Sequence, residues 1–184
     1  MQKKELKHKS ESISFRVPCD LLSELHEEAE RKEISLNTLV TQIMRRHVDW
    51  YSFAAYAGFV YVTKGFIMKT LQKISEEDII SIAKYTSEKE TKDFVLLLRN
   101  QYNARSALDV IETWIRISGY PYRHKIDNTT HSYVIQHDMG RKWSLRLVEI
   151  YQFILSEFKM NDEQVFDVGE NTLSFSVNFP KVYE

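Results

Sequence analysis

The stretch ISFRVPCDLLSELHEEAERKEISLNTLVTQIMRRHV, residues 13–48, contains the clearest pattern in the chain. From Glu11 to Pro18 apolar and polar residues alternate strictly, which is the period of a strand with one buried face. Pro18 is expected to end this strand because proline cannot donate a ladder hydrogen bond. The apolar residues of the segment are Ile13, Phe15 and Val17, and its polar residues are Ser12, Ser14 and Arg16.

Two amphipathic helices are expected after the strand. The first opens at Cys19 or Asp20, and its apolar residues recur at three- and four-residue spacing, which predicts about three to four turns. Ser35 is a good N-cap for the second helix, which runs on toward Trp50. The apolar positions are Leu21, Leu22, Leu25 and Ala29 in the first helix, and Leu39, Val40, Ile43, Met44 and Val48 in the second.

One strand and two short helices cannot bury their own apolar faces, because the strand lacks a partner and about fifty residues give a marginal core. Pairing of two copies about a two-fold axis would form a two-stranded antiparallel ribbon with a polar outer face. Residues 11–50 resemble the ribbon-helix-helix family, the class of the Arc and methionine repressors. The resemblance implies a homodimer, with higher order on DNA left open, and a β-α-α DNA-binding domain over residues 11–55.

The resemblance also implies which residues contact double-stranded DNA. The outward side chains of the ribbon, Ser12, Ser14 and Arg16, are expected to read bases in the major groove. The phosphate backbone is expected at the N-terminus of the second helix, where free N–H groups form an anion site. The phosphate contacts are then Lys7, Lys9, Ser35, Leu36 and Asn37. Family members commonly have glycine where this chain has Glu33, so we expect the turn after the first helix to be tightened in a different way.

Charge and composition limit the classes of function. Residues 1–10 form a basic tail, but the whole chain has a formal net charge of -1, so its global charge indicates no nucleic-acid or membrane partner. The single cysteine, Cys19, excludes an internal disulfide framework. Nowhere do 18 apolar residues follow one another, and the N-terminus has no apolar stretch behind its lysines. We therefore expect a cytoplasmic protein that does not contact membranes.

Residues 59–184 are predicted to form an α+β sensing or interaction domain, with the boundary near Ala54 to Gly58. After strand-like FVYVTK (59–64), helices are expected over 66–71, from Ser75 to about 84, over 94–98 and over 104–117. A hairpin of strands 120–126 and 132–136 follows, with the turn Asp127, Asn128 and Thr129. A helix over 141–158 and strands over 164–168 and 173–179 complete the domain.

Two ligand sites come into question in this domain. His124, His131 and His137 suggest a metal sensor by analogy with the nickel-responsive repressor, but structural histidines are favoured and no metal or cofactor is predicted. A weak anion site is expected at a helix N-terminus, formed by His137, Asp138, Arg141 and Lys142. The favoured alternative is a strand-to-helix turn in which Asp138 caps the helix and Trp143 belongs to the core.

The patterns favour a sequence-specific transcriptional regulator over an enzyme. The chain has no Gly-rich phosphate loop, nucleophile elbow or HExxH motif. An unknown ligand or protein is expected at the C-terminal domain. The alternative function is an antitoxin-like protein-interaction module, in which the C-terminal domain binds a protein and the N-terminal segment mainly dimerises.

Overall fold

The computed structural model describes residues 11–14, 16–158 and 165–179. The chain divides into two compact units, unit 1 (Met1–Arg45) and unit 2 (Arg46–Glu184). Among the described residues, none of the helices combines the length and the apolar character needed to cross a bilayer.

Unit 1 consists of two helices, α1 (Cys19–Arg31) and α2 (Leu36–Arg46), the second of which ends one residue into unit 2. The hydroxyl of Ser35 accepts a hydrogen bond from the backbone N–H of Thr38 at 3.0 Å, so this serine is the predicted N-cap. Only Ala29 in α1 and Leu39 in α2 are buried. Unit 1 by itself therefore has a very small core.

The predicted N-terminal strand is wrong. Residues 11–14 and 16–18 belong to no helix or strand, and Ile13 is 76% exposed. A strand needs a neighbour that accepts and donates its ladder hydrogen bonds, and the described residues provide none for this segment. Alternation alone therefore does not produce a strand, and the described N-terminal region is helical rather than β-α-α.

The turn between α1 and α2 has the geometry that glycine usually supplies. Glu33 adopts a left-handed backbone conformation with φ of 53°. The N–H of Ile34 bonds to the carbonyl of Ala29, and the N–H of Glu33 bonds to that of Glu30, both at 3.0 Å. These two bonds form a Schellman motif, so the expectation of a different turn at Glu33 is also corrected.

We predict that Glu33→Gly stabilises the protein. The left-handed conformation costs an L-residue about 1–2 kcal/mol, which glycine avoids. Part of this stabilisation is offset because glycine has a larger conformational entropy in the unfolded chain. The free energy of unfolding, measured by urea denaturation, should rise by about 0.5–1 kcal/mol. Glu30→Gly is the matched control, because it places glycine inside α1 and should lower the same quantity by about 1 kcal/mol. A loss of stability in Glu33→Gly would contradict the prediction.

Unit 2 contains most of the regular structure. A π-helix, η1 (His47–Tyr51), leads into the short α3 (Ser52–Ala54), and α4 (Lys64–Lys73) follows. Residues 59–63 belong to no strand, so the strand-like reading of FVYVTK is wrong. The remaining helices are α5 (Glu76–Arg99), α6 (Ala104–Ile117) and α7 (Arg141–Ser156).

Helix α5 is one helix of 24 residues where two were expected. Its buried face includes the polar residues Ser87 and Thr91 between Ala83 and Val95. The Ser87 hydroxyl donates to the carbonyl of Ala83 at 2.6 Å and so can be buried without losing a hydrogen bond. Polar residues on the buried face interrupt the apolar pattern but do not interrupt the helix.

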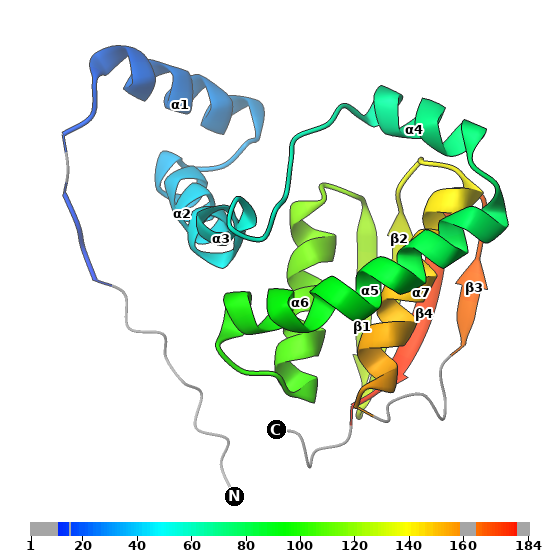
Figure 1. The fold of residues 1–184 in the computed structure, drawn as a ribbon. Coiled ribbons are helices and arrows are strands. Elements are labelled where there is room, and N and C mark those ends of the chain that lie inside the picture. The colour runs from blue at the N-terminus through cyan, green and yellow to red at the C-terminus, as the bar shows by residue number, and fades with distance from the viewer. Residues whose placement is uncertain (1–10, 15, 159–164, 180–184) are drawn as a thin grey trace, which may run out of the picture. The chain divides into compact units, whose positions relative to one another are not determined.

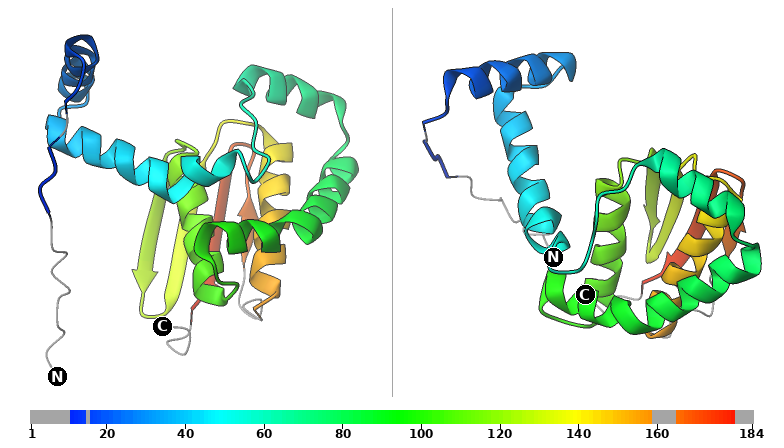
Figure 2. Two further views of the ribbon diagram at one scale, coloured as in Figure 1. Left: turned by 60° about the vertical axis from the view of Figure 1, so that its left-hand side comes forward. Right: turned by 45° about the horizontal axis from the view of Figure 1, so that its top comes forward.

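The four strands of unit 2 form one antiparallel sheet in the order β1-β2-β4-β3. They are β1 (Tyr122–Asp127), β2 (Thr130–Gln136), β3 (Phe166–Val168) and β4 (Thr172–Asn178). Figures 1 and 2 show α6 and α7 on one face of this sheet, with α5 across α7 on the side away from the strands. The main core lies between α6, α7 and the sheet and includes Tyr133, Ile135, Leu147, Tyr151, Leu173, Phe175 and Val177.

Candidate functional site

The residues predicted to contact DNA lie in two places in unit 1. Ser12, Ser14 and Arg16 are exposed on the irregular segment before α1. Ser35 is exposed at the N-terminus of α2, directly before Leu36 and Asn37. Lys7 and Lys9 lie outside the described residues. The structure does not bring Ser12, Ser14 and Arg16 together on a ribbon, and their contact with DNA stays a prediction.

The predicted anion site in unit 2 is a network of internal hydrogen bonds. His137 is buried, and its Nδ1 accepts from the backbone N–H of Met139 at 3.0 Å. Its Nε2 lies 2.8 Å from the Ser144 hydroxyl, which in turn lies 2.9 Å from the carbonyl of Gly169. Because Nδ1 accepts a hydrogen bond, the neutral ring carries its proton on Nε2 and donates it to Ser144. Burial, together with the charge of Lys64, lowers the pKa of His137, whereas Asp138 opposes this shift.

Arg141 and Lys142 also have partners within the chain. Arg141 donates to the carbonyl of Val168 at 3.0 Å and lies 3.6 Å from a carboxylate oxygen of Glu76. Lys142 donates to the carbonyls of Leu71 and Ile74, at the C-terminal end of α4. The expected capping of α7 by Asp138 is not seen, because the N-cap residue is Gly140 and no side chain caps it. These basic groups therefore connect α7 to its neighbours.

We predict that Ser144→Ala destabilises the protein by about 1–3 kcal/mol, since it leaves the buried His137 N–H and the Gly169 carbonyl without this partner. Urea denaturation measures the effect. Ser156→Ala is the matched control on the same helix, because Ser156 is exposed and bonds only locally, to the carbonyl of Phe153. Equal stability of the two variants would show that the His137 network contributes nothing.

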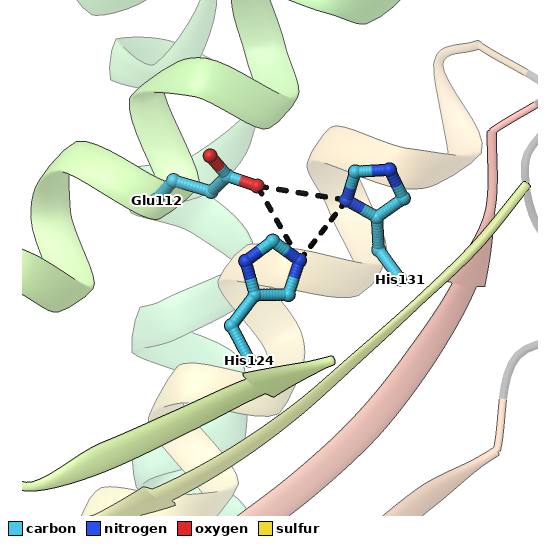
Figure 3. A group of neighbouring side chains, drawn as sticks. All are labelled: Glu112, His124 and His131. Carbon is cyan, nitrogen blue, oxygen red and sulfur yellow. Dashed lines mark hydrogen bonds and ion pairs between the residues drawn. The ribbon is translucent and has the colours of Figure 1, made fainter. Parts of the chain in front are cut away.

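A cluster of three metal-ligating side chains lies on the inner side of the β1–β2 hairpin. Glu112 comes from α6, His124 from β1 and His131 from β2. The register pairs His124 with Tyr133 and Ile126 with His131, so both histidines point to the face that the helices cover. Figure 3 shows the two imidazole rings and the carboxylate converging on one point.

The three side chains are close but are not fully hydrogen-bonded to one another. His124 Nε2 and His131 Nδ1 lie 3.1 Å apart. Glu112 Oε1 lies 3.8 Å from His124 Nε2 and 3.6 Å from His131 Nδ1. Both of these distances exceed an ordinary hydrogen bond. The cluster is therefore held mainly by the fold and not by hydrogen bonds among its members.

Tyr133 supports this cluster from the core. Its hydroxyl donates to Glu112 Oε1 at 2.5 Å, and its ring stacks on His124 with the centroids 4.3 Å apart. Burial, followed by the hydrogen bond to Glu112, strongly raises the pKa of Tyr133, so the hydroxyl keeps its proton. Burial and the neighbouring His124 lower the pKa of His131, with Glu112 opposing them. Both shifts favour a neutral tyrosine donor and a neutral imidazole, and the Tyr133 hydroxyl also lies 3.3 Å from His131 Nδ1.

A cavity of about 480 Å³ is a second feature of unit 2. Its walls come from residues 56–59, α5, α6 and α7 and are largely aromatic and aliphatic. Trp114, Phe59 and Phe94 pack edge-on or tilted with ring centroids 5.2–6.2 Å apart. Arg146 also lines the cavity, and its Nη1 is buried without a hydrogen-bond partner among the described residues. The guanidinium lies over the Trp143 ring, 4.6 Å from its centroid, and the acidic residues Glu90 and Asp93 also line the cavity.

Sequence reasoning named both histidines of the cluster but missed Glu112. No local motif links position 112 to positions 124 and 131, because the glutamate comes from a different element. The sequence signal that existed was the hairpin, whose register determines which histidines share a face. His137 also points inward but lies beyond β2, in the network with Ser144.

Comparison with protein-family models matches residues 2–44 to the HicB family. HicB is an antitoxin family and is distinct from the ribbon-helix-helix family of the Arc and methionine repressors. The assignment of residues 11–50 to that repressor family is therefore wrong, and the helical N-terminal region agrees with this correction. No curated protein and no solved structure matches the chain.

Proposed function

We propose that this chain is an antitoxin-like protein-interaction module rather than a regulator that acts by itself on DNA. The observation that carries the proposal is the match of residues 2–44 to the antitoxin family HicB. In this proposal unit 1 joins two copies of the chain, and unit 2 binds a partner protein encoded beside it. The arrangement of exposed apolar residues in each unit supports this division of roles.

Unit 1 has the apolar surface that a second copy would cover. Leu21 and Leu22 on α1 are 46% and 36% exposed, and Ile43 and Met44 on α2 are each 45% exposed. A unit whose helices bury only Ala29 and Leu39 gains little stability alone, so association of two such faces would supply the missing core. A second copy suits this face because both copies expose the same apolar residues, which a two-fold symmetric contact would bury together.

We predict that the full chain is a dimer in solution and that Ile43→Glu shifts it to monomer, because a charge on the apolar face of α2 would be desolvated on association. Sedimentation analysis at micromolar concentration measures the mass. Ile82→Glu is the matched control, since Ile82 is an isoleucine of unit 2 that is 52% exposed. A monomeric wild-type chain, or a dimer unaffected by Ile43→Glu, would contradict dimerisation through this face.

Unit 2 has an exposed apolar segment of a different kind. Residues 59–63 form no helix or strand, and Val60 and Tyr61 in this segment are 78% and 91% exposed. Tyr56 and Phe66, on either side, are 85% and 62% exposed. Aromatic side chains frequently act as anchors of protein interfaces. The residues at the start of this segment and directly before it, Tyr56–Phe59, line the cavity that Arg146 also lines.

The partner that fits unit 2 is therefore a protein with an apolar contact surface and a carboxylate. The apolar surface would cover Val60 and Tyr61, and the carboxylate would reach the guanidinium of Arg146 through the cavity. A carboxylate that bonds to Arg146 Nη1, which has no hydrogen-bond partner among the described residues, would distinguish this partner from a second copy docking through apolar contact alone.

The partner is tested by co-expression with the protein encoded beside this chain. We expect the two to purify as a complex and the chain to relieve growth inhibition by that protein. Tyr61→Asp should weaken the complex about tenfold or more, because loss of an aromatic anchor costs about 1–2 kcal/mol or more. Tyr85→Asp is the matched control, since Tyr85 is a tyrosine of α5 that is 64% exposed. Absence of a complex, together with specific DNA binding by the chain alone, would favour the regulator instead.

A further inference from the structure

We propose that Glu112, His124 and His131 bind one Zn²⁺ ion in unit 2 through Glu112 Oε1, His124 Nε2 and His131 Nδ1. This inference does not depend on the proposed partner protein. It rests on the separations of the ligand atoms, on the Glu112-to-ring distances that ordinary hydrogen bonds do not explain, and on the support that the core gives to the three side chains.

The separations of the three ligand atoms suit one ion. In a tetrahedral zinc site with bonds of about 2.0–2.1 Å, neighbouring ligand atoms lie about 3.3 Å apart. The observed separations are 3.1 Å between the two nitrogens, and 3.6 Å and 3.8 Å from Glu112 Oε1 to the nitrogens. Shifts of a few tenths of an ångström, which side-chain rotation can supply, would make all three atoms equidistant from a central ion.

Hydrogen bonds account for only part of this geometry. Between the two ring nitrogens at 3.1 Å only one can donate, and Glu112 Oε1 is too distant from both for an ordinary hydrogen bond. The Tyr133 hydroxyl donates to Glu112 Oε1 and also lies 3.3 Å from His131 Nδ1, so it reaches two of the three atoms, but Glu112 bonds to neither ring. A divalent cation would interact with all three ligand atoms at once and would draw Glu112 toward both rings.

The surroundings hold these ligands in place. Tyr133 is 1% exposed, donates to Glu112 Oε1 and stacks on His124, so it orients one ligand of each type. Groups behind the ligands tune metal affinity in this way. The ligand side chains are 35%, 22% and 18% exposed for Glu112, His124 and His131, so an ion can enter from solvent.

The donor set selects the class of metal. Two imidazoles and one carboxylate, without a thiolate, suit Zn²⁺ and related first-row ions such as Co²⁺ better than Mg²⁺ or Ca²⁺, which prefer oxygen ligands alone. Three protein ligands leave the fourth tetrahedral position for water or for an exchangeable ligand. The ion would also link α6 to β1, an edge strand in which all six residues are exposed. Zinc should therefore stabilise the folded protein.

The test uses the untagged full chain, freed of metal with a chelator. Calorimetric titration with zinc chloride should give one ion per chain, and zinc should raise the Tm. His124→Ala and His131→Ala should each abolish this binding. His26→Ala is the matched control, because His26 is an exposed histidine of α1, and it should bind zinc as the wild type does. Tyr133→Phe should lower the affinity about tenfold, less than loss of a ligand.

A second measurement needs no variant. Nuclear magnetic resonance of the wild-type imidazoles should show zinc-dependent shifts at His124 Nε2 and His131 Nδ1 and none at His26 or His137. The proposal is overturned if zinc fails to bind, if binding survives both histidine substitutions in chains that unfold cooperatively, or if these two rings do not respond to zinc.

Discussion

The pairing of β2 with β4 under α6 and α7 is the interaction on which the rest of unit 2 depends. Seven residue pairs join the two strands, and Tyr133, Ile135, Leu173, Phe175 and Val177 from this pair are all at most 2% exposed. The register determines which side chains lie on the buried face, because a shift of one residue would turn every side chain of a strand to the other face. The outer strands, β1 and β3, add to an arrangement that the central pair has already determined.

This central pair explains why polar groups occur beside the core. His131 pairs with Val177 and Tyr133 pairs with Phe175, so both polar side chains belong to the buried face. Their polar atoms lie where α6 approaches the hairpin, and Glu112 meets them there. Burial of a hydroxyl or imidazole is costly unless it is paired, and here the partners come from the neighbouring helix. Packing and the candidate metal site thus share Tyr133.

Much of unit 2 could be predicted from the sequence because its signals are local. Ser75 and Asn103 accept backbone hydrogen bonds as N-caps, and helix α6 has the expected bounds of residues 104–117. The hairpin was also expected, but with a turn of three residues, Asp127 to Thr129. The structure instead pairs Asp127 with Thr130, so only two residues connect the strands.

That one-residue difference decides the candidate site. A three-residue turn would place His124 opposite Ser132 and leave His131 on the other face of the hairpin. The observed register puts both histidines on one face, and Glu112 then joins them through tertiary packing. Local patterns did not contain this information, because it depends on turn length and on which helix covers the strands.

The N-terminal segment illustrates the opposite problem, since its local signal was strong and misleading. Alternation over residues 11–18 predicts a buried strand face only if another strand completes the ladder, and within the described chain none does. The helices that follow have the same incompleteness, because the apolar residues Leu22 and Ile43 remain exposed. An apolar pattern indicates which side chains are buried in the assembled protein, but it does not identify the element or the chain that buries them. In the dimer proposed for unit 1, a second chain would cover these residues through contacts between helices, without any strand.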